Sequence, residues 1–201
     1  MTVVKPAARK TQSQRREETS NLVLASAIKL FAGKGYTATS LEDVAADTGL
    51  TIRPIYHYFG NKIQLFEAVT ETQEQLLLEQ LLALDPSSPN ILYEAWDCFI
   101  DCCQQPGFVQ IVLVDAPHIL GRERLANTSV VKQVKKMLVQ GQRGLKIKSR
   151  LSALDQEFAM RMLVGGLTEA ALMVGTNPDY DSRVMIKRIF TFLAPDKNLP
   201  G

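Results

Sequence analysis

Hydrophobic positions along the chain recur at the three- and four-residue spacing of α-helices, and no segment shows the alternation typical of a strand. The first helix is predicted over about residues 15–34, with an apolar stripe of Leu24, Ala27, Ile28 and Phe31. Further helices are predicted at about residues 41–48, 52–59, 62–84, 90–104, 107–115, 122–143, 153–175 and 180–193. Proline and glycine lie almost wholly between these ranges. The predicted fold class is therefore all-α, with about nine helices.

Two short helices joined by a glycine turn are predicted over residues 40–59. Ser40 and Asp43 have the spacing of a capping box at the start of the first helix, and Gly49 supplies a residue free to adopt positive φ. Thr51 is expected to cap the second helix. The buried stripe of that helix is predicted to be Ile52, Ile55 and Phe59. This arrangement is the helix-turn-helix pattern, which predicts DNA binding.

Five side chains of the second helix lie outside its buried stripe: Arg53, Pro54, Tyr56, His57 and Tyr58. Arg53 falls in the first turn, where recognition helices meet base edges and an arginine can donate two hydrogen bonds to guanine. Pro54 in that turn sacrifices no intrahelical hydrogen bond and is expected to pack on a thymine methyl group. The three aromatic side chains are expected to bond phosphates or stack on sugar edges.

Phosphate contacts are also predicted around the helix ends. Thr39, Ser40 and Thr51 lie at helix N-termini, where backbone N–H groups and the helix dipole favour anions. Lys62 begins the next helix and is expected to neutralise another phosphate. Taken alone, each of these residues is equally consistent with ordinary packing or with a solvated surface position. DNA binding is favoured because the helix caps, the glycine turn and the exposed polar face all occur together at the expected spacing.

The segments Phe31–Ser40, Val44–Ala45, Gly49–Thr51 and Ile55–Lys62 resemble the DNA-binding signature of the TetR (tetracycline repressor-like) regulators, over about residues 15–66. The resemblance implies a three-helix DNA-binding head on a larger, variable, helical ligand-binding domain that forms a homodimer. It also implies that family members commonly touch DNA at the positions of Thr39, Ser40, Thr51, Tyr56, His57 and Lys62. The pair Arg53-Pro54 fills a place where a small residue often starts the helix, so no relative supplies the operator sequence.

Three parts of the chain are predicted on this basis: a flexible basic arm (1–14), a helix-turn-helix DNA-binding domain (15–66), and a helical ligand-binding and dimerisation domain (67–201). The last two helices carry a broad apolar band, and Gly165-Gly166 would allow close approach of another helix. By resemblance, these helices form a four-helix bundle across a two-fold axis. Alternatively, this apolar band packs inside the monomer as part of its core. We favour a band that serves both the core and the dimer interface. The predicted interface residues are Leu163, Gly166, Leu167, Ala170, Val174, Ile186, Ile189 and Phe190.

A ligand pocket is predicted between the helices of this larger domain. Asp115 and His118, near the break at Pro117, are candidates to bond the polar end of a ligand; alternatively, Asp115 caps a turn and His118 is exposed. Apolar side chains at helical spacing belong to a core more often than to a binding site. The predicted pocket residues are Trp96, Phe99, Phe108, Val112, Asp115, His118, Phe158 and Met162.

Charge is unevenly spread along the chain. Residues 1–66 hold nine Lys/Arg and five Asp/Glu, whereas residues 67–201 hold fourteen and sixteen. A basic first third suggests that only this part meets a polyanion. No run approaches the ~18 apolar residues of a membrane span, and the N-terminal residues lack the apolar centre of a secretory signal. A cytoplasmic location without membrane association is expected.

Three function classes compete at this stage. The favoured one is a sequence-specific transcriptional regulator, a homodimer on a palindromic double-stranded operator, acting as a repressor released by a small, largely apolar effector. The alternatives are a ligand-independent architectural DNA binder and a thiol-based redox or metal sensor using Cys98 and Cys102, although clustered free thiols usually pack as small hydrophobes. An enzyme is not expected, since catalytic motifs are missing from the sequence, and no cofactor or metal is predicted.

Overall fold

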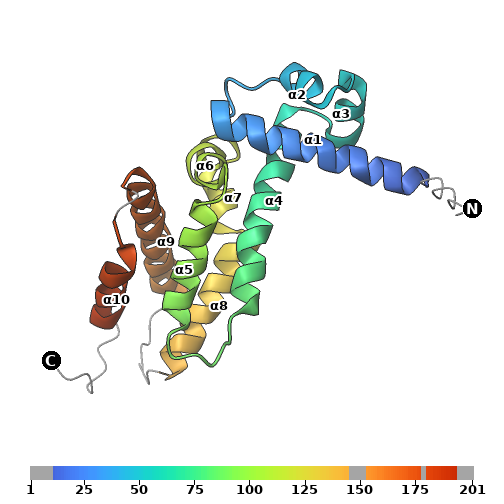
Figure 1. Cartoon of the computed structure of the whole chain (residues 1–201). Helices are drawn as coiled ribbons and strands as arrows, with labels where there is room; N and C mark the ends of the chain where they lie inside the picture. The colour runs from blue at the N-terminus through green and yellow to red at the C-terminus, as the bar shows by residue number, and fades with distance from the viewer. Residues whose placement is uncertain (1–10, 145–152, 178–179, 194–201) are drawn as a thin grey trace, which may run out of the picture. The chain divides into compact units, whose positions relative to one another are not determined.

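The structure is a computed structural model that describes residues 11–144, 153–177 and 180–193 (Figure 1). Every regular element in these ranges is helical, which confirms the all-α class. The chain divides into two compact units, residues 1–69 and 70–201, and the boundary falls inside α4. The elements are α1 (Gln12–Lys34), α2 (Leu41–Thr48), α3 (Ile52–Phe59), α4 (Lys62–Ala83), α5 (Ile91–Cys103), the π-helix η1 (Val109–Asp115), α6 (Ala116–Ile119), α7 (Arg122–Ala126), α8 (Ser129–Gly144), α9 (Ala153–Thr176) and α10 (Ser182–Leu193).

In the N-terminal unit, α1, α2 and α3 pack on one another around a small apolar core. Its centre is aromatic: the ring centroid of Phe66 lies 5.1 Å from that of Phe31 and 4.8 Å from that of Tyr36, both edge-to-face. These rings fix the start of α4 against the end of α1. The other fully buried apolar side chains of the unit include Val23, Ala27, Val44, Ile55, Leu65 and Val69.

Helix α1 begins three residues earlier than predicted. The Thr11 hydroxyl accepts a hydrogen bond from the Gln14 backbone N–H, and the Gln14 side chain accepts one from the Thr11 N–H. This reciprocal capping box satisfies two N–H groups that the first turn would otherwise leave unpaired. The predicted flexible arm therefore gives way to helix at Gln12.

Helix α2 is tied to α1 through one carboxylate. Asp47 accepts hydrogen bonds from the Ser26 hydroxyl at 2.7 Å and from the Lys29 ammonium at 2.6 Å. The Lys29 hydrogen bond, followed by that of Ser26, holds the pKa of Asp47 below its usual value. The last turn of α2 is thus anchored on α1, which orients the glycine turn and α3 that follow it.

In the C-terminal unit, α5 contacts α8, α9 and α10, and α9 also contacts η1. Trp96 of α5 donates its Nε1–H to the hydroxyl of Ser182, at the start of α10, over 3.2 Å. Arg183 extends this attachment with an ion pair to Asp97 at 2.9 Å. Helix α10 is therefore held on α5 by its first turn. None of the described helices is long and apolar enough to cross a membrane.

Two of the predicted helices differ in detail. The segment predicted as one helix over 122–143 is broken into α7 and α8, because the Thr128 hydroxyl accepts the Val131 N–H and starts a new helix. The segment predicted as an α-helix over 107–115 is largely π-helical, with the Ala116 N–H bonded to the Ile111 carbonyl. Pro117, which has no N–H, cannot continue an α-helical pattern back to Leu113.

Candidate DNA-binding face of the N-terminal unit

Helix α3 has one buried residue of its predicted apolar stripe, Ile55, whereas Ile52 and Phe59 of that stripe are half-buried. Ile55 is buried in the core of the unit, with 1% of its surface exposed. Arg53, Tyr56 and His57, at i, i+3 and i+4, are exposed together on the opposite face, and half of the Tyr56 surface is accessible. Arg53 makes no hydrogen bond or ion pair with any described residue. These three side chains serve no core function and are available to a partner.

Two further side chains of α3 are partly packed against the unit and partly exposed to solvent. Pro54 and Tyr58 are half-buried. The Arg16 guanidinium lies 5.8 Å from the centre of the Tyr58 ring, and the Tyr58 and His57 ring centroids are 5.2 Å apart. Tyr58 therefore helps to pack α1 against α3, which restricts the DNA contacts predicted for it to its exposed edge.

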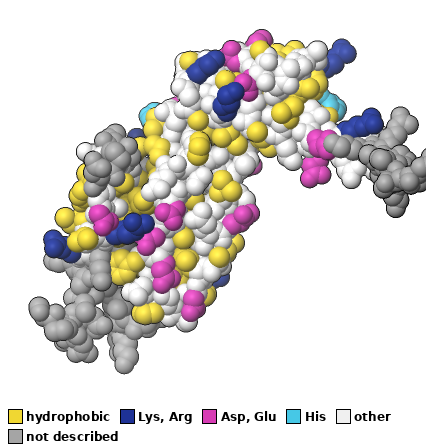
Figure 2. Space-filling view, viewed as in Figure 1, with side chains coloured by type: hydrophobic (Ala, Val, Ile, Leu, Met, Phe, Trp, Pro, Cys, Tyr) yellow, Lys and Arg dark blue, Asp and Glu magenta, His cyan; other side chains and the backbone are white. Residues whose placement is uncertain are grey.

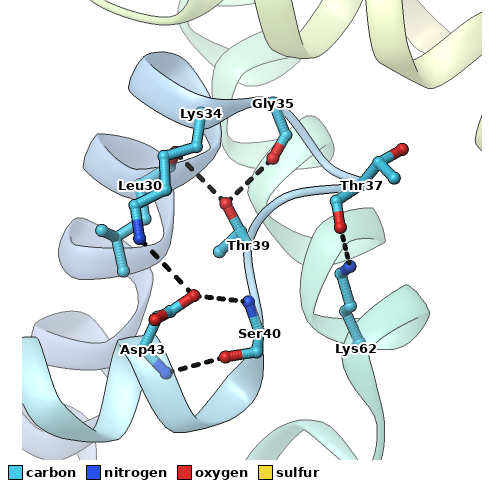
Figure 3. A network of polar contacts seen from close by, with 8 residues as sticks. All are labelled: Leu30, Lys34, Gly35, Thr37, Thr39, Ser40, Asp43 and Lys62. Carbon is cyan, nitrogen blue, oxygen red and sulfur yellow. Dashed lines mark hydrogen bonds and ion pairs between the residues drawn. The ribbon is translucent and has the colours of Figure 1, made fainter.

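A shallow groove opens between the start of α2, Tyr56 and Lys62. The backbone N–H groups in the first turn of α2 and the positive end of its dipole border it, which favours an anion there. The Ser40 hydroxyl accepts the Asp43 N–H at 3.0 Å, and Asp43 accepts the Ser40 N–H at 2.9 Å. Figure 3 shows this capping box and, on the loop before α2, the Thr37 carbonyl that faces Lys62. The groove is lined by Thr37, Ala38, Thr39, Ser40, Leu41, Glu42, Tyr56 and Lys62.

Lys62 is held in place at this groove. Its ammonium donates to the Thr37 carbonyl at 3.4 Å (Figure 3). It also lies 4.2 Å from the centre of the Tyr36 ring. A cation over an aromatic face is stabilised by the ring quadrupole, and the Tyr36 ring is itself fixed on Phe66. The positive charge is thus positioned by the aromatic core of the unit.

The contact predicted for the Thr39 side chain is corrected by the structure. Thr39 has 2% of its surface exposed, and its hydroxyl lies 2.9 Å from the Gly35 carbonyl and 3.3 Å from the Leu30 carbonyl (Figure 3). The hydroxyl donates to these carbonyls at the end of α1. The hydroxyl shapes the turn between α1 and α2, and because its proton is engaged there it has none to donate to a phosphate.

The predicted cap at Thr51 is also absent: its side chain makes no capping hydrogen bond. A capping hydroxyl bonds the N–H of the second or third helical residue, and the third residue of α3 is Pro54, which has no N–H. Thr51 is exposed. Its hydroxyl therefore remains available to bond a phosphate, although the helix gains no stability from it.

These two N-cap residues should respond differently to alanine. Ser40→Ala should lower the free energy of unfolding by about 1 kcal/mol, since a real cap is lost. Thr51→Ala should leave stability within about 0.5 kcal/mol and weaken DNA binding instead. Urea unfolding and DNA-binding titrations of both variants measure the contrast. An equal loss of stability in the two variants would contradict the absence of the Thr51 cap.

The C-terminal unit contains an apolar cavity of about 120 Å³. Four of the predicted pocket residues, Trp96, Phe99, Phe108 and Val112, line it. The apolar lining residues from α4, α7 and α8 were not predicted from the sequence. Their only signal was an apolar position at helical spacing, which core residues share. These additional residues are Leu77, Leu81, Leu125, Val130, Val131 and Val134.

The other four predicted pocket residues lie elsewhere. Phe158 and Met162 are about two-thirds exposed on α9 and do not line the cavity, so their assignment to the pocket is wrong. His118 is exposed, and its Nδ1 lies 2.8 Å from the Val114 carbonyl. Asp115 ends η1 and does not line the cavity. Neither of these polar side chains lines the cavity.

An exposed apolar face runs along α9. It is formed by Leu154, Phe158, Met162 and Met173, with the exposed pair Gly165 and Gly166 between them. Val184 and Met185 of α10 are exposed as well, and Figure 2 shows hydrophobic side chains on this part of the surface.

The predicted interface residues divide between this face and the interior. Gly166 is exposed, whereas Leu167, Ala170 and Val174 are half-buried and Leu167 lines the cavity. Ile186 is buried, which corrects its assignment to an external interface: it lies one turn after Ser182 on the face of α10 that packs on α5. The side chains of Leu163, Ile189 and Phe190 are outside the described residues.

The cysteines of α5 have the properties of packing residues. Burial, with smaller contributions from Cys98 and Asp101, raises the pKa of the Cys102 thiol to about 11, and burial raises that of Cys103 to about 12. Burial and the neighbouring Asp101 and Asp97 also raise the pKa of Cys98. Thiolates are the reactive and metal-binding form, so these environments disfavour both chemistries. The described residues hold no group of three or more potential metal ligands.

Comparison with known proteins agrees with this geometry. Over 114 residues, the chain is 29% identical to the HTH-type transcriptional repressor NicS of Pseudomonas putida, covering 53% of this chain and 52% of that protein. Over 82 residues, it is 35% identical to the HTH-type transcriptional regulator AcrR of Shigella flexneri, covering 41% of this chain and 38% of that protein. The matches thus span about half of the first relative and less of the second.

A solved structure, a TetR-family transcriptional regulator from Pectobacterium atrosepticum, is similar over most of its length. It matches at a TM-score of 0.65 and 26% identity, with 92% of this chain and 95% of that chain covered. Residues 23–69 match the profile of bacterial regulatory proteins of the tetR family, and residues 90–191 match the tetracyclin repressor-like C-terminal domain. The chain belongs to the tetR family of bacterial regulatory proteins.

Proposed function

We propose that this protein is a homodimeric, sequence-specific DNA-binding transcriptional regulator of the cytoplasm, a repressor released from a palindromic operator by a small, largely apolar ligand. The observation that carries the proposal is the exposed face of α3, where Arg53, Tyr56 and His57 have no internal role. Family membership supports the same function. The protein acts by binding, and no catalytic step is assigned to it.

The proposed DNA contacts divide into two kinds. Arg53, in the first turn of α3, reads base edges in the major groove, and Tyr56 and His57 lie along the same exposed face. Lys62 and the first turn of α2 bind phosphate at the groove described above. Phosphate contacts set affinity and register, whereas the α3 side chains set the sequence preference.

The proposed homodimer rests on the exposed face of α9. Consecutive glycines inside a helix are unfavourable by about 1 kcal/mol each relative to alanine. A Cβ atom added at Gly165 or Gly166 would meet no atom of the chain within 4 Å, so no internal contact requires either glycine. A second copy approaching closely along α9 would require both. It would also bury Phe158 and Met162, which are otherwise large hydrophobic side chains exposed to water.

The direct experiment is selection of DNA fragments by the purified protein, followed by footprinting of those retained. A regulator of this kind protects an inverted repeat whose half-sites are centred about one helical turn apart. Binding to all fragments with equal affinity, without a footprint, would favour the architectural alternative. Failure to bind any fragment in low salt would refute the proposal.

Substitutions at Arg53 and Lys62 should separate the two kinds of contact. Arg53→Ala should relax the base preference at one position of each half-site, at a cost of about 1–3 kcal/mol on the preferred base. Lys62→Ala should weaken binding to all sequences and reduce the slope of log affinity against log salt by about one per protomer. Fluorescence anisotropy with operator variants at several salt concentrations measures both effects.

Lys132, an exposed lysine of α8, is the matched control, because its removal changes the net charge equally without touching the proposed face. Lys132→Ala should leave the salt slope unchanged. If Arg53→Ala retained full affinity and full base preference, α3 would not read DNA through this residue.

A further inference from the structure

The cavity of the C-terminal unit has a size that restricts what it can hold. Its volume is about 120 Å³. Apolar cavities of about 150 Å³ take up benzene, whereas pockets for drug-sized ligands measure roughly 300–1,000 Å³. Because the cavity is close to the lower figure, one six-membered ring or a short branched chain fits it without rearrangement of the walls.

Most of the cavity wall is apolar. Leu77 and Leu81 come from α4, Val112 and Leu113 from η1, and Val131 from α8. On α5 the rings of Trp96 and Phe99 meet edge-to-face with centroids 5.7 Å apart, and Phe99 lies 6.2 Å from Phe108. An ion entering such a space would lose its hydration without a compensating partner.

One charged side chain, Glu74, reaches the cavity, and it already has a partner. Its two carboxylate oxygens accept hydrogen bonds from the two terminal nitrogens of Arg124, at 2.9 and 3.2 Å. Both side chains are largely buried, with 12% and 21% of their surface exposed. Arg124 also lies 3.9 Å from Glu71. A cationic ligand at Glu74 would have to displace the Arg124 guanidinium, and an anionic ligand at Arg124 would have to displace the Glu74 carboxylate. Either exchange takes apart a largely buried ion pair, which is strongly unfavourable. The ion pair therefore closes the cavity to ligands of either sign.

Two threonine hydroxyls are the other groups at the cavity that can form hydrogen bonds with a ligand. Thr128 Oγ1 accepts the Val131 N–H at 3.2 Å, and its own proton can still be donated. Thr168 Oγ1 donates to the Val164 carbonyl at 2.8 Å and retains a lone pair that can accept. Both residues line the cavity. A single hydroxyl or N–H on a ligand can thus be satisfied there, although an ionised group cannot.

We propose that this cavity binds an uncharged ligand of about one aromatic ring, apolar over most of its surface and carrying at most one hydroxyl or N–H group. The proposal names the class of effector and rests on the proposed role of this unit in sensing. It excludes carboxylates, amines and ligands of two or more rings as occupants of the cavity.

The chain provides its own reporter. Trp96 is the only tryptophan of the sequence, it lines the cavity, and 3% of its surface is exposed. Its emission, excited where the added compounds do not absorb, should therefore change when the cavity fills. The test uses pairs of probes of similar size that differ in charge: benzyl alcohol against benzylammonium, and benzyl alcohol against benzoate. Toluene and biphenyl test polarity and size.

Toluene and benzyl alcohol should shift the emission saturably, and benzyl alcohol should bind at least tenfold more tightly than either of its charged counterparts. Biphenyl should bind at least tenfold more weakly than toluene. Equal binding of the charged and neutral members of both pairs, or no saturable response to any neutral single-ring probe, would overturn the proposal.

Two variants locate the binding. Val112→Phe fills the cavity from η1 and should abolish the response to toluene, whereas Val114→Phe, on the exposed side of the same helix, should preserve it. Thr168→Val, which keeps the shape of the side chain, should reduce the affinity for benzyl alcohol several-fold and leave that for toluene unchanged. Circular dichroism confirms that each variant is folded, and unaltered toluene binding by folded Val112→Phe would overturn the assignment to this cavity.

Binding and regulation are read out separately. If neutral probes bind but leave the operator complex intact, the ligand class stands and the proposed release mechanism fails. If a charged or larger compound releases the operator while neutral rings do not bind, sensing stands and the ligand class is refuted.

Discussion

Phe158→Glu combined with Met162→Glu should convert the proposed dimer into a monomer and weaken operator binding by at least about 100-fold. Both side chains are about two-thirds exposed in the single chain, so charge there is tolerated by the monomer. Across a two-fold interface, the same changes bring four carboxylates into an apolar contact, where each is desolvated without a partner. Loss of the second half-site removes the advantage of linked binding, which is worth about 10²–10⁴ in affinity. Analytical ultracentrifugation and operator titration measure the two losses.

Leu82→Glu is the control for this variant, because Leu82 is a large exposed hydrophobic residue of α4 outside the α9 face. It should remain dimeric. Gly166→Leu adds a second, independent test, since its Cβ has free space in the single chain. This variant should keep its helix content and lose the dimer. If the double glutamate variant remained a dimer of unchanged affinity, the interface would lie elsewhere.

Phe66→Ala should destabilise the N-terminal unit by about 3–5 kcal/mol, a large part of the stability of a small domain. Phe66 is fully buried and packs edge-to-face on both Phe31 and Tyr36. Its removal leaves a cavity at the centre of the unit and frees the Tyr36 ring that lies beneath Lys62. DNA binding should therefore fall together with stability.

Hydrogen exchange of the amides in α1, α2 and α3 reports the stability of the N-terminal unit separately from that of the C-terminal unit. Thermal melting gives the size of the loss of stability. Phe66→Leu should cost much less, because most of the buried volume is retained. Leu22→Ala, at an exposed position of α1, should be nearly neutral. A change below 1 kcal/mol for Phe66→Ala would contradict the central role of the aromatic cluster.

The helices of the N-terminal unit were predictable because local signals agree with one another there. Ser40 caps α2, Gly49 adopts the left-handed conformation with φ of 68°, and Ile55 is buried, as the spacing indicates. Local signals also explain the main error, since Thr51 has the identity of a cap but Pro54 removes one of the two N–H groups that its hydroxyl could bond. Thr39 shows the same limit: its position at a helix start was visible, whereas its bonds to carbonyls of the preceding helix depend on tertiary structure.

The C-terminal unit was harder to predict because its apolar helices carry more than one hydrophobic face. From the sequence alone, Phe158 and Trp96 are equally good candidates for pocket residues. In the structure Trp96 is buried and Phe158 is exposed. Only the packing of α9 against α5 decides between them. Charge pairing was equally invisible, since Glu74 and Arg124 are fifty residues apart.

The π-helix η1 has a consequence for chain length. The Ile111 N–H bonds the Gly107 carbonyl four residues back, the Ala116 N–H bonds Ile111 five residues back, and the Leu120 N–H bonds Ala116 four residues back. The helical register is therefore offset by one residue between Gly107 and Leu120. An α-helix spanning the same ends needs one amino acid fewer, so this segment can accept a single-residue deletion that would misalign every later side chain in a regular helix.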